Sequence, residues 1–325
     1  MNEISLPKKI GCIFIALAIS FITFCVGVVG DLSLMYFAMF LTIPTYSAMF
    51  LTFPNYIYSI FPLISSIGIY LVTGKILNAV FSIMFLILAS LCAEGVFRKR
   101  TKYNTIVRMS VVMFFASLMI FALSIYSTYG ELSREVIVGF AEELFDILVE
   151  YISSSLSLGG EELEAYKLMI IELSYVSLGS FLFLFVILSY ISCTFSRKIV
   201  YWFNPETRLF NFDNLWEFEM PIESAYIYII SYAFLFVVPL AKIEIPAVEV
   251  AIYAVVYPLM AGMIVSGIKQ IKQWLKEKHT GKGLFIGLIV LGFLLFSSLV
   301  LSVTGFIGVY RCFSVNKETK WNVEK

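Results

Sequence analysis

Long apolar runs without charge restrict what this chain can fold into. Leu32–Gly74 contains no charged residue. Hydrophobic residues make up 60% of the 325 residues and charged residues 14%, whereas a soluble domain is about 45–50% apolar and about 25% charged. Because about 20 apolar residues in a helix cross the hydrocarbon core of a bilayer, the pattern predicts an all-α, multi-pass membrane protein.

The apolar runs are long enough for about nine spans. We expect them at about 10–29, 32–53, 56–73, 76–93, 109–129, 173–196, 224–241, 250–268 and 283–310. Pro54-Asn55 is the expected turn between the second and third spans, because proline disfavours helix in the residue before it and asparagine favours turns. Pro44 and Pro62 fall inside these two spans, and each is expected to kink or break its helix.

The longest polar segment, Gly130–Glu172, carries ten acidic and two basic residues. Apolar residues recur every four positions between Val136 and Ile152, which is typical of an amphipathic helix. A second helix is expected to begin near Glu161 and to continue into the sixth span. We interpret the segment as a helical hairpin that caps one face of the membrane bundle. The alternatives are a lid over a cavity and a surface for partner docking.

Clusters of lysine and arginine predict the orientation of the chain. They occur at Lys8-Lys9, at 98–108, at Arg197-Lys198 and at 269–282. Cytoplasmic loops are enriched in these residues, so we expect a cytoplasmic N-terminus in the cell membrane and the acidic segment outside. Nine spans then place the C-terminus outside, although the basic residues of the tail favour the inner side. The alternative is a bend in the ninth run that returns the tail to the inner face.

This order of spans predicts three parts of the chain. They are an N-terminal five-span unit (1–129), the acidic outer helices (130–172) and a C-terminal four-span unit (173–325). The last contains an inner aromatic loop at 197–223. Trp202 and Trp216 are expected to hold this loop at the membrane interface, and Pro221 suits the first turn of the seventh span. The alternative is that these three residues contact a protein partner.

Three stretches of sequence resemble the YybS-like family of bacterial polytopic membrane proteins. Phe212–Pro221, which reads FDNLWEFEMP, resembles an F-x-x-W-x-x-P element before a span, with slightly longer spacing. Leu259–Val265 is similar to a glycine-containing eighth span, and Gly305–Arg311 resembles the end of the last span, with Gly308 where an acidic residue is usual. The N-terminal half looks like the substrate-binding S components of energy-coupling-factor vitamin transporters, which implies a transport-related role.

A small group of polar residues is expected at the outer ends of the spans. Asp31, Asn78 and Glu172 approach this face in the predicted topology, beside spans that contain Pro44 and Pro62. Interrupted helices often form membrane binding sites, so we predict a site for a small apolar ligand there. The alternative is that these residues only cap helix ends or bond to neighbouring helices.

The sequence gives little support for catalysis or metal binding. The five cysteines form no CxxC pair, and we interpret them as small buried hydrophobic residues. The single histidine, His279, makes Ser–His or Cys–His catalysis implausible. Zero net charge gives no reason to expect nucleic acid. We therefore expect no enzyme activity, no catalytic residues, no cofactor and no metal site.

Two functions remain open at this level. The first is a transport-related or small-molecule-binding membrane protein. The second is a structural or regulatory membrane protein that acts through partner contacts of the outer acidic helix and the inner aromatic loop. A closed polar pocket near the outer face would favour the first. A packed bundle with an exposed apolar face over Val136–Ile152 would favour the second.

Overall fold

The computed structural model describes residues 6–52, 60–156, 161–203, 216–241, 245–277 and 299–315. These residues form helices joined by short connections, which confirms the all-α prediction. The helices are α1 (Leu6–Val29), α2 (Leu32–Thr52), α3 (Ile60–Thr73), α4 (Ile76–Phe97), α5 (Lys102–Tyr129), α6 (Arg134–Leu156), α7 (Glu161–Phe203), α8 (Ile222–Leu240) and α9 (Pro246–Glu277), followed by the helix Leu299–Val315.

Six of these helices are long and apolar enough to cross a membrane, fewer than the nine we predicted. They are Leu34–Thr52, Ile76–Phe97, Lys102–Tyr129, Glu162–Phe203, Ile222–Leu240 and Pro246–Glu277. The other three apolar helices, Ile13–Val29, Ile60–Thr73 and Leu299–Val315, are shorter within the described residues. The chain is therefore a multi-pass membrane protein by the length and composition of its helices, but the count of nine spans is not supported.

Several predictions fall on residues outside the described ranges. These are the turn at Pro54-Asn55, the first four residues of the FDNLWEFEMP stretch, the first half of the ninth run and His279. The prediction that Pro44 and Pro62 kink or break their helices can be examined for the break alone. α2 continues through Pro44, and Pro62 is the third residue of α3 as described. Neither helix is therefore broken at its proline, and a kink stays a prediction. α2 is enclosed by packing against α1 and α4.

The amphipathic helix predicted in the acidic segment is confirmed as α6. Ser133 Oγ accepts a hydrogen bond from the Val136 backbone N–H over 3.3 Å at its start, which satisfies one of the free donors of the first turn. The predicted second helix is also confirmed, because α7 begins at Glu161 and runs for 43 residues into the sixth predicted span.

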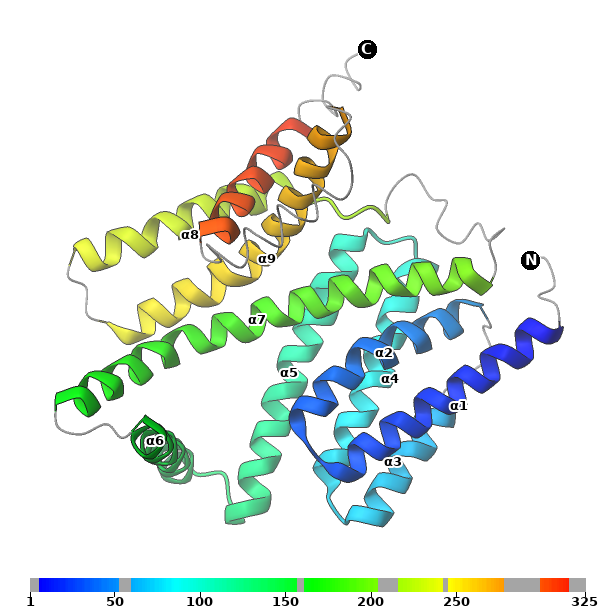
Figure 1. Cartoon of the computed structure of the whole chain (residues 1–325), viewed down its shortest axis with the longest axis horizontal. Helices are drawn as coiled ribbons and strands as arrows, with labels where there is room; N and C mark the ends of the chain where they lie inside the picture. Colours follow the sequence, from blue (N-terminus) through cyan, green and yellow to red (C-terminus); the bar gives the residue numbers. More distant parts are fainter. Residues whose placement is uncertain are drawn as a thin grey trace. The chain divides into compact units, whose positions relative to one another are not determined.

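The chain divides into two compact units. The first contains Met1–Ile171 and Leu188–Trp216, and the second contains Glu172–Ile187 and Glu217–Lys325. α7 thus contributes separate segments to each. In the first unit α4 packs against α1, α2, α3 and α5 (Figure 1). Its buried face is rich in small residues, including Ala89, Ala93 and Gly95, which permits close approach of neighbouring helices.

The connection between α4 and α5 is tight. Thr101 caps α5, with its hydroxyl accepting a hydrogen bond from the Asn104 N–H over 3.2 Å. Gly95 lies directly against the Thr105 side chain, and a Cβ there would come within 2.7 Å of Thr105 Cγ2. The two helices are therefore held together at this end, and this contact positions the first residues of α5.

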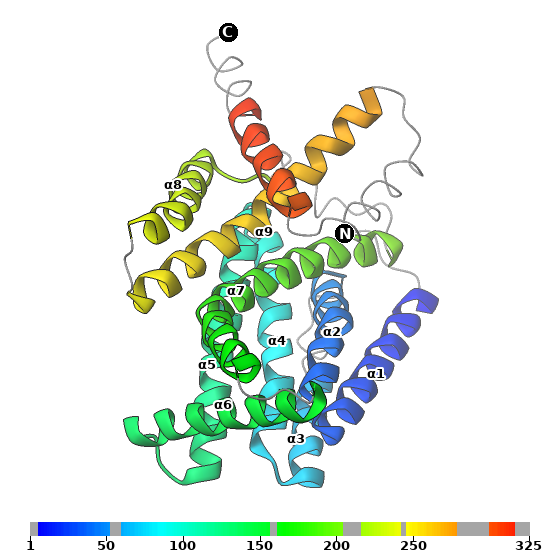
Figure 2. The same ribbon diagram turned by 60° about the vertical axis from the view of Figure 1, so that its left-hand side comes forward.

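α6 runs across the end of α5 rather than along it (Figures 1 and 2). The Phe140 ring is 5.8 Å from the Phe121 ring of α5 and 6.1 Å from the Tyr129 ring, measured between centroids. Tyr129 also donates a hydrogen bond to Glu143. Much of the remaining apolar face is exposed, as in Ile137, Leu144, Ile147 and Leu148, and Tyr151 is 69% exposed.

In the second unit, α9 packs against α8 and against the helix Leu299–Val315. Gly267 meets the backbone of Thr304, and Gly308 meets the backbone of Met263. A side chain at either glycine would prevent this approach. The last helix runs antiparallel to α8, because Tyr232 lies 3.3 Å from Ser302 while the Tyr226 and Phe313 rings are 5.2 Å apart.

A cluster of charges closes one end of the second unit. Glu219 accepts hydrogen bonds from Lys269 over 3.0 Å and from Arg311 over 2.8 Å, and Arg311 also bonds to Gln270 over 3.2 Å. The end of the last helix therefore lies beside the start of the basic loop, at the end of the unit where α8 begins. This position agrees with the alternative in which a bend in the ninth run returns the chain to the side of the basic residues, whereas the tail after Val315 lies outside the described residues.

Labelling of single engineered cysteines tests this topology. We expect Ser314→Cys to react with a membrane-impermeant maleimide only after cells are permeabilised, as Lys276→Cys and Lys99→Cys should. Glu142→Cys in α6 should react in intact cells, because the basic loops predict that the acidic segment is outside. The unsubstituted chain measures background from its own cysteines. Reaction of Ser314→Cys in intact cells together with Glu142→Cys would contradict the topology.

The charge cluster also predicts a pH dependence of stability. Burial alone would raise the pKa of Glu219, but the hydrogen bonds and positive charges of Arg311 and Lys269 lower it below its ordinary value. A lowered pKa in the folded state stabilises the protein above the ordinary pKa of about 4.3, and this contribution is lost as the pH falls through the folded-state pKa.

Glu219→Gln should therefore unfold at a lower temperature than the wild type at pH 7. The difference should shrink as the pH falls below about 4. Thermal unfolding in detergent at several pH values measures this, with the exposed Glu217→Gln as the matched control. Equal unfolding temperatures of Glu219→Gln and the wild type at pH 7 would show that the ion pairs do not hold this end together.

Candidate functional site

The residues predicted to form an outer ligand site have identifiable structural contacts. Asp31 accepts a hydrogen bond from the Leu34 N–H over 3.0 Å and so caps α2. The Asn78 side-chain amide donates to the Gly27 carbonyl over 2.8 Å and joins α4 to α1. Glu172 is exposed and is the first residue of the second unit. The contacts of Asp31 and Asn78 are those of the capping alternative, and ligand binding by the three residues stays a prediction.

The residues predicted to contact a partner differ in exposure. Trp202 is 71% exposed, with its ring 5.0 Å from that of Phe203, whereas Trp216 is only 2% exposed. Pro221 is half-buried and directly precedes α8. Trp202 is thus the member of this group whose side chain is available to lipid or protein, and its role in partner contact stays a prediction.

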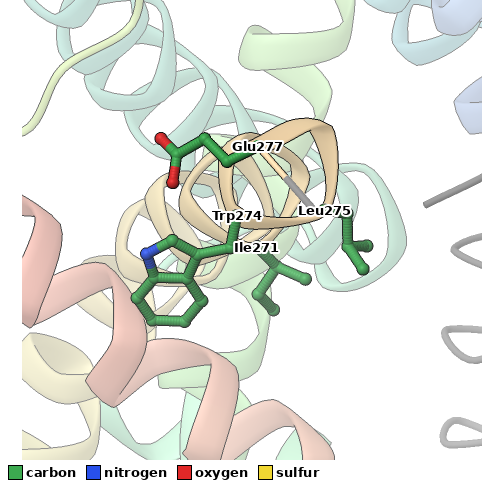
Figure 3. Close-up of a pocket in the computed structure, with 4 residues that line it drawn as sticks. All are labelled: Ile271, Trp274, Leu275 and Glu277. Carbon is green, nitrogen blue, oxygen red and sulfur yellow. The ribbon is translucent and has the colours of Figure 1, made fainter. Parts of the chain in front are cut away.

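A shallow pocket lies at the end of α9 (Figure 3). Ile271, Trp274, Leu275 and Glu277 line it, and the Trp274 ring is 5.9 Å from that of Tyr310. Among the residues that the structure describes, three apolar side chains and one carboxylate provide apolar contact with little polar discrimination. This pocket therefore gives a weak basis for specific recognition.

The strongest site is a buried lysine in the first unit. Lys102 is the first residue of α5 and is only 6% exposed. Its ammonium donates a hydrogen bond to Thr194 Oγ1 over 2.7 Å and lies 4.4 Å from the centre of the Tyr190 ring. Burying an ammonium is costly. An ionisable side chain enclosed in a membrane bundle therefore marks a candidate functional site.

Sulfur atoms from three helices meet beside this lysine. Cys193, which directly precedes Thr194 in α7, has its Sγ 3.7 Å from the Sγ of Cys92 in α4 and 3.7 Å from the Sδ of Met109 in α5. Cys92 Sγ also lies 3.7 Å from Ser196 Oγ. All four side chains are fully buried. The helices thus bring the Cys193 thiol into contact with both the Cys92 thiol and the Met109 thioether.

Hydroxyl groups extend the same polar core. Ser189 Oγ is 3.2 Å from Ser110 Oγ and 3.9 Å from Met113 Sδ. Ser47 of α2 hydrogen-bonds over 3.1 Å to the Ala89 carbonyl of α4. We call the following set the Lys102 cluster: Cys92, Lys102, Met109, Ser110, Met113, Ser189, Cys193, Thr194 and Ser196.

The cluster combines a positive charge, soft sulfur atoms and hydroxyls in a site enclosed by protein. Such groups can hold a small ion or ligand by charge and coordination. Cys92, Lys102 and Cys193 are buried, whereas Thr194 is half-buried.

The sequence contains only part of the signal for this site. Lys102, Met109 and Met113 recur at a spacing that places them on one face of a helix, as do Ser189, Cys193 and Ser196. We assigned Lys102 to a cytoplasmic basic loop and the cysteines to ordinary hydrophobic packing. Cys92 and Cys193 are 101 residues apart, and no local pattern shows that the faces carrying them meet.

Comparisons with known proteins add no name to this fold. No family model, no curated protein and no solved structure matches the chain. The resemblance to the YybS-like family stays a prediction. The helices and the buried polar site together define the class as a helical multi-pass membrane protein with a polar core in its N-terminal unit.

Paired substitutions test how Lys102 is held. Thr194→Val keeps the side-chain shape but removes the hydrogen-bond acceptor, and it should destabilise the protein by about 1–3 kcal/mol. Lys102→Met removes the charge itself and should leave stability within about 1 kcal/mol of the wild type or raise it, because buried charges often contribute little net stability. Chemical unfolding in detergent measures these differences. A fully tolerated Thr194→Val would contradict the buried contact.

Proposed function

We propose that this protein binds a small ligand or ion at the Lys102 cluster and has a transport-related role in the membrane. One observation supports this most directly, namely the enclosure of the Lys102 ammonium among thiol and hydroxyl groups. Simple packing of helices needs no such charge. Its retention is explained if the site binds something that requires it.

The position of the cluster along the helices supports approach from the inner end. Lys102 directly follows the cap residue Thr101 and the basic residues Arg98, Lys99 and Arg100. In the orientation predicted from the basic loops, this is the cytoplasmic side. The proposed site therefore differs from the outer group of Asp31, Asn78 and Glu172.

A second candidate function is contact with another membrane protein through α6. The exposed apolar face of α6 supports it, together with the packed interior of the first unit. Phe140 shows that this face turns toward the body of α5. A partner would therefore have to contact α6 beside α5. Lipid could cover the same apolar surface without any partner.

Native mass spectrometry of the protein purified in mild detergent tests the leading proposal. We expect a bound small molecule or ion on the wild type, its loss in Lys102→Met and its retention in the matched control Lys198→Met, because Lys198 is exposed on α7. A subunit that stays bound in Lys102→Met but dissociates in Leu148→Glu would support the second candidate. A wild-type mass equal to that of the chain alone, or an adduct kept in Lys102→Met, would contradict ligand binding at the cluster.

A further inference from the structure

We infer that Cys92, Cys193 and Met109 form a binding site for Cu(I). This inference rests on the proposed function, because it names the ligand class of the Lys102 cluster. It departs from the expectation that the cysteines only fill space. That expectation followed from the absence of CxxC pairs in the sequence. In the fold, Cys92 of α4 and Cys193 of α7 form a pair that is far apart in the sequence.

The spacing of the sulfur atoms suits coordination of one metal ion. Cys193 Sγ lies 3.7 Å from Cys92 Sγ and 3.7 Å from Met109 Sδ. Two sulfur atoms at this separation subtend about 107° at a metal ion that is about 2.3 Å from each, close to the tetrahedral angle. The spacing therefore suits an ion that bridges Cys193 to each of its two sulfur neighbours.

The types of ligand atom select among metals. Thiolate and thioether sulfur are soft donors that favour Cu(I), whereas structural zinc sites use cysteine and histidine. The described residues contain no group of three His, Cys, Asp or Glu side chains that could hold a metal ion. The third ligand would be the Met109 thioether, and a thioether ligand favours Cu(I) over zinc.

Charge balance favours the same ion. Binding replaces the two thiol protons, which leave as H⁺, so two thiolates and one Cu(I) carry a net charge of −1. Lys102 lies next to this group through Thr194 and supplies +1. The Lys102 ammonium therefore offsets the negative charge of the loaded site.

Anaerobic titration with Cu(I) alone tests the inference on the purified full-length protein. Competition with bicinchoninate should give one high-affinity ion per chain. Cys92→Ser and Cys193→Ser should abolish it, and Met109→Leu should weaken binding at least about tenfold. Cys312→Ser is the matched control, because Cys312 also contacts a methionine, Met263, over 3.9 Å but has no second thiol in that contact. X-ray absorption should show only sulfur neighbours at about 2.2–2.3 Å.

The outcomes separate this inference from the proposed function. Absence of Cu(I) binding, or binding unchanged in the double variant Cys92→Ser/Cys193→Ser, would overturn the copper site. If a different ligand then dissociates in Lys102→Met during native mass spectrometry, the proposed function survives without copper. Size-exclusion profiles and unfolding temperatures show whether each variant is folded, and Met109→Leu keeps the test valid if the cysteine variants are not.

Discussion

The burial of the Lys102 ammonium is the constraint on which the first unit depends. A charge can be enclosed in this setting only if neighbouring groups replace the water it loses. Thr194 and Tyr190 of α7 provide these contacts. Lys102 can reach these residues because Thr101 caps α5 directly before it and because Gly95 allows α4 to lie close to α5. The position of one charge therefore depends on three helices at once.

The same arrangement explains why the site is made of sulfur and hydroxyl groups. Serine and cysteine are small enough for close helix packing, and each can bond to a neighbouring backbone carbonyl or side chain. Ser196 and Thr194, for example, hydrogen-bond to carbonyls of their own helix over 2.7 Å while facing Cys92 and Lys102. The residues that permit tight packing are thus also those that provide ligand atoms.

How much was predictable differs between the fold and the site. Composition and periodicity are local, and they predicted an all-α membrane protein, the amphipathic α6 and the start of α7 at Glu161. The place of the end of the last helix beside the start of α8 depends on the pairing of Arg311 with Glu219, two residues 92 positions apart. The Lys102 cluster likewise depends on which faces of α4, α5 and α7 meet. Periodicity places residues on a face but does not specify the partner of that face.

The contact between α4 and α7 is the central claim, and disulfide mapping tests it most directly. Membranes containing the wild-type protein are treated with iodine, a small apolar oxidant, and the peptides are analysed by mass spectrometry. We expect a cross-linked peptide that joins Cys92 to Cys193, since their sulfur atoms are 3.7 Å apart. A bond from Cys92 to Cys25 or Cys312 instead, or free thiols at both Cys92 and Cys193 after treatment, would contradict the arrangement.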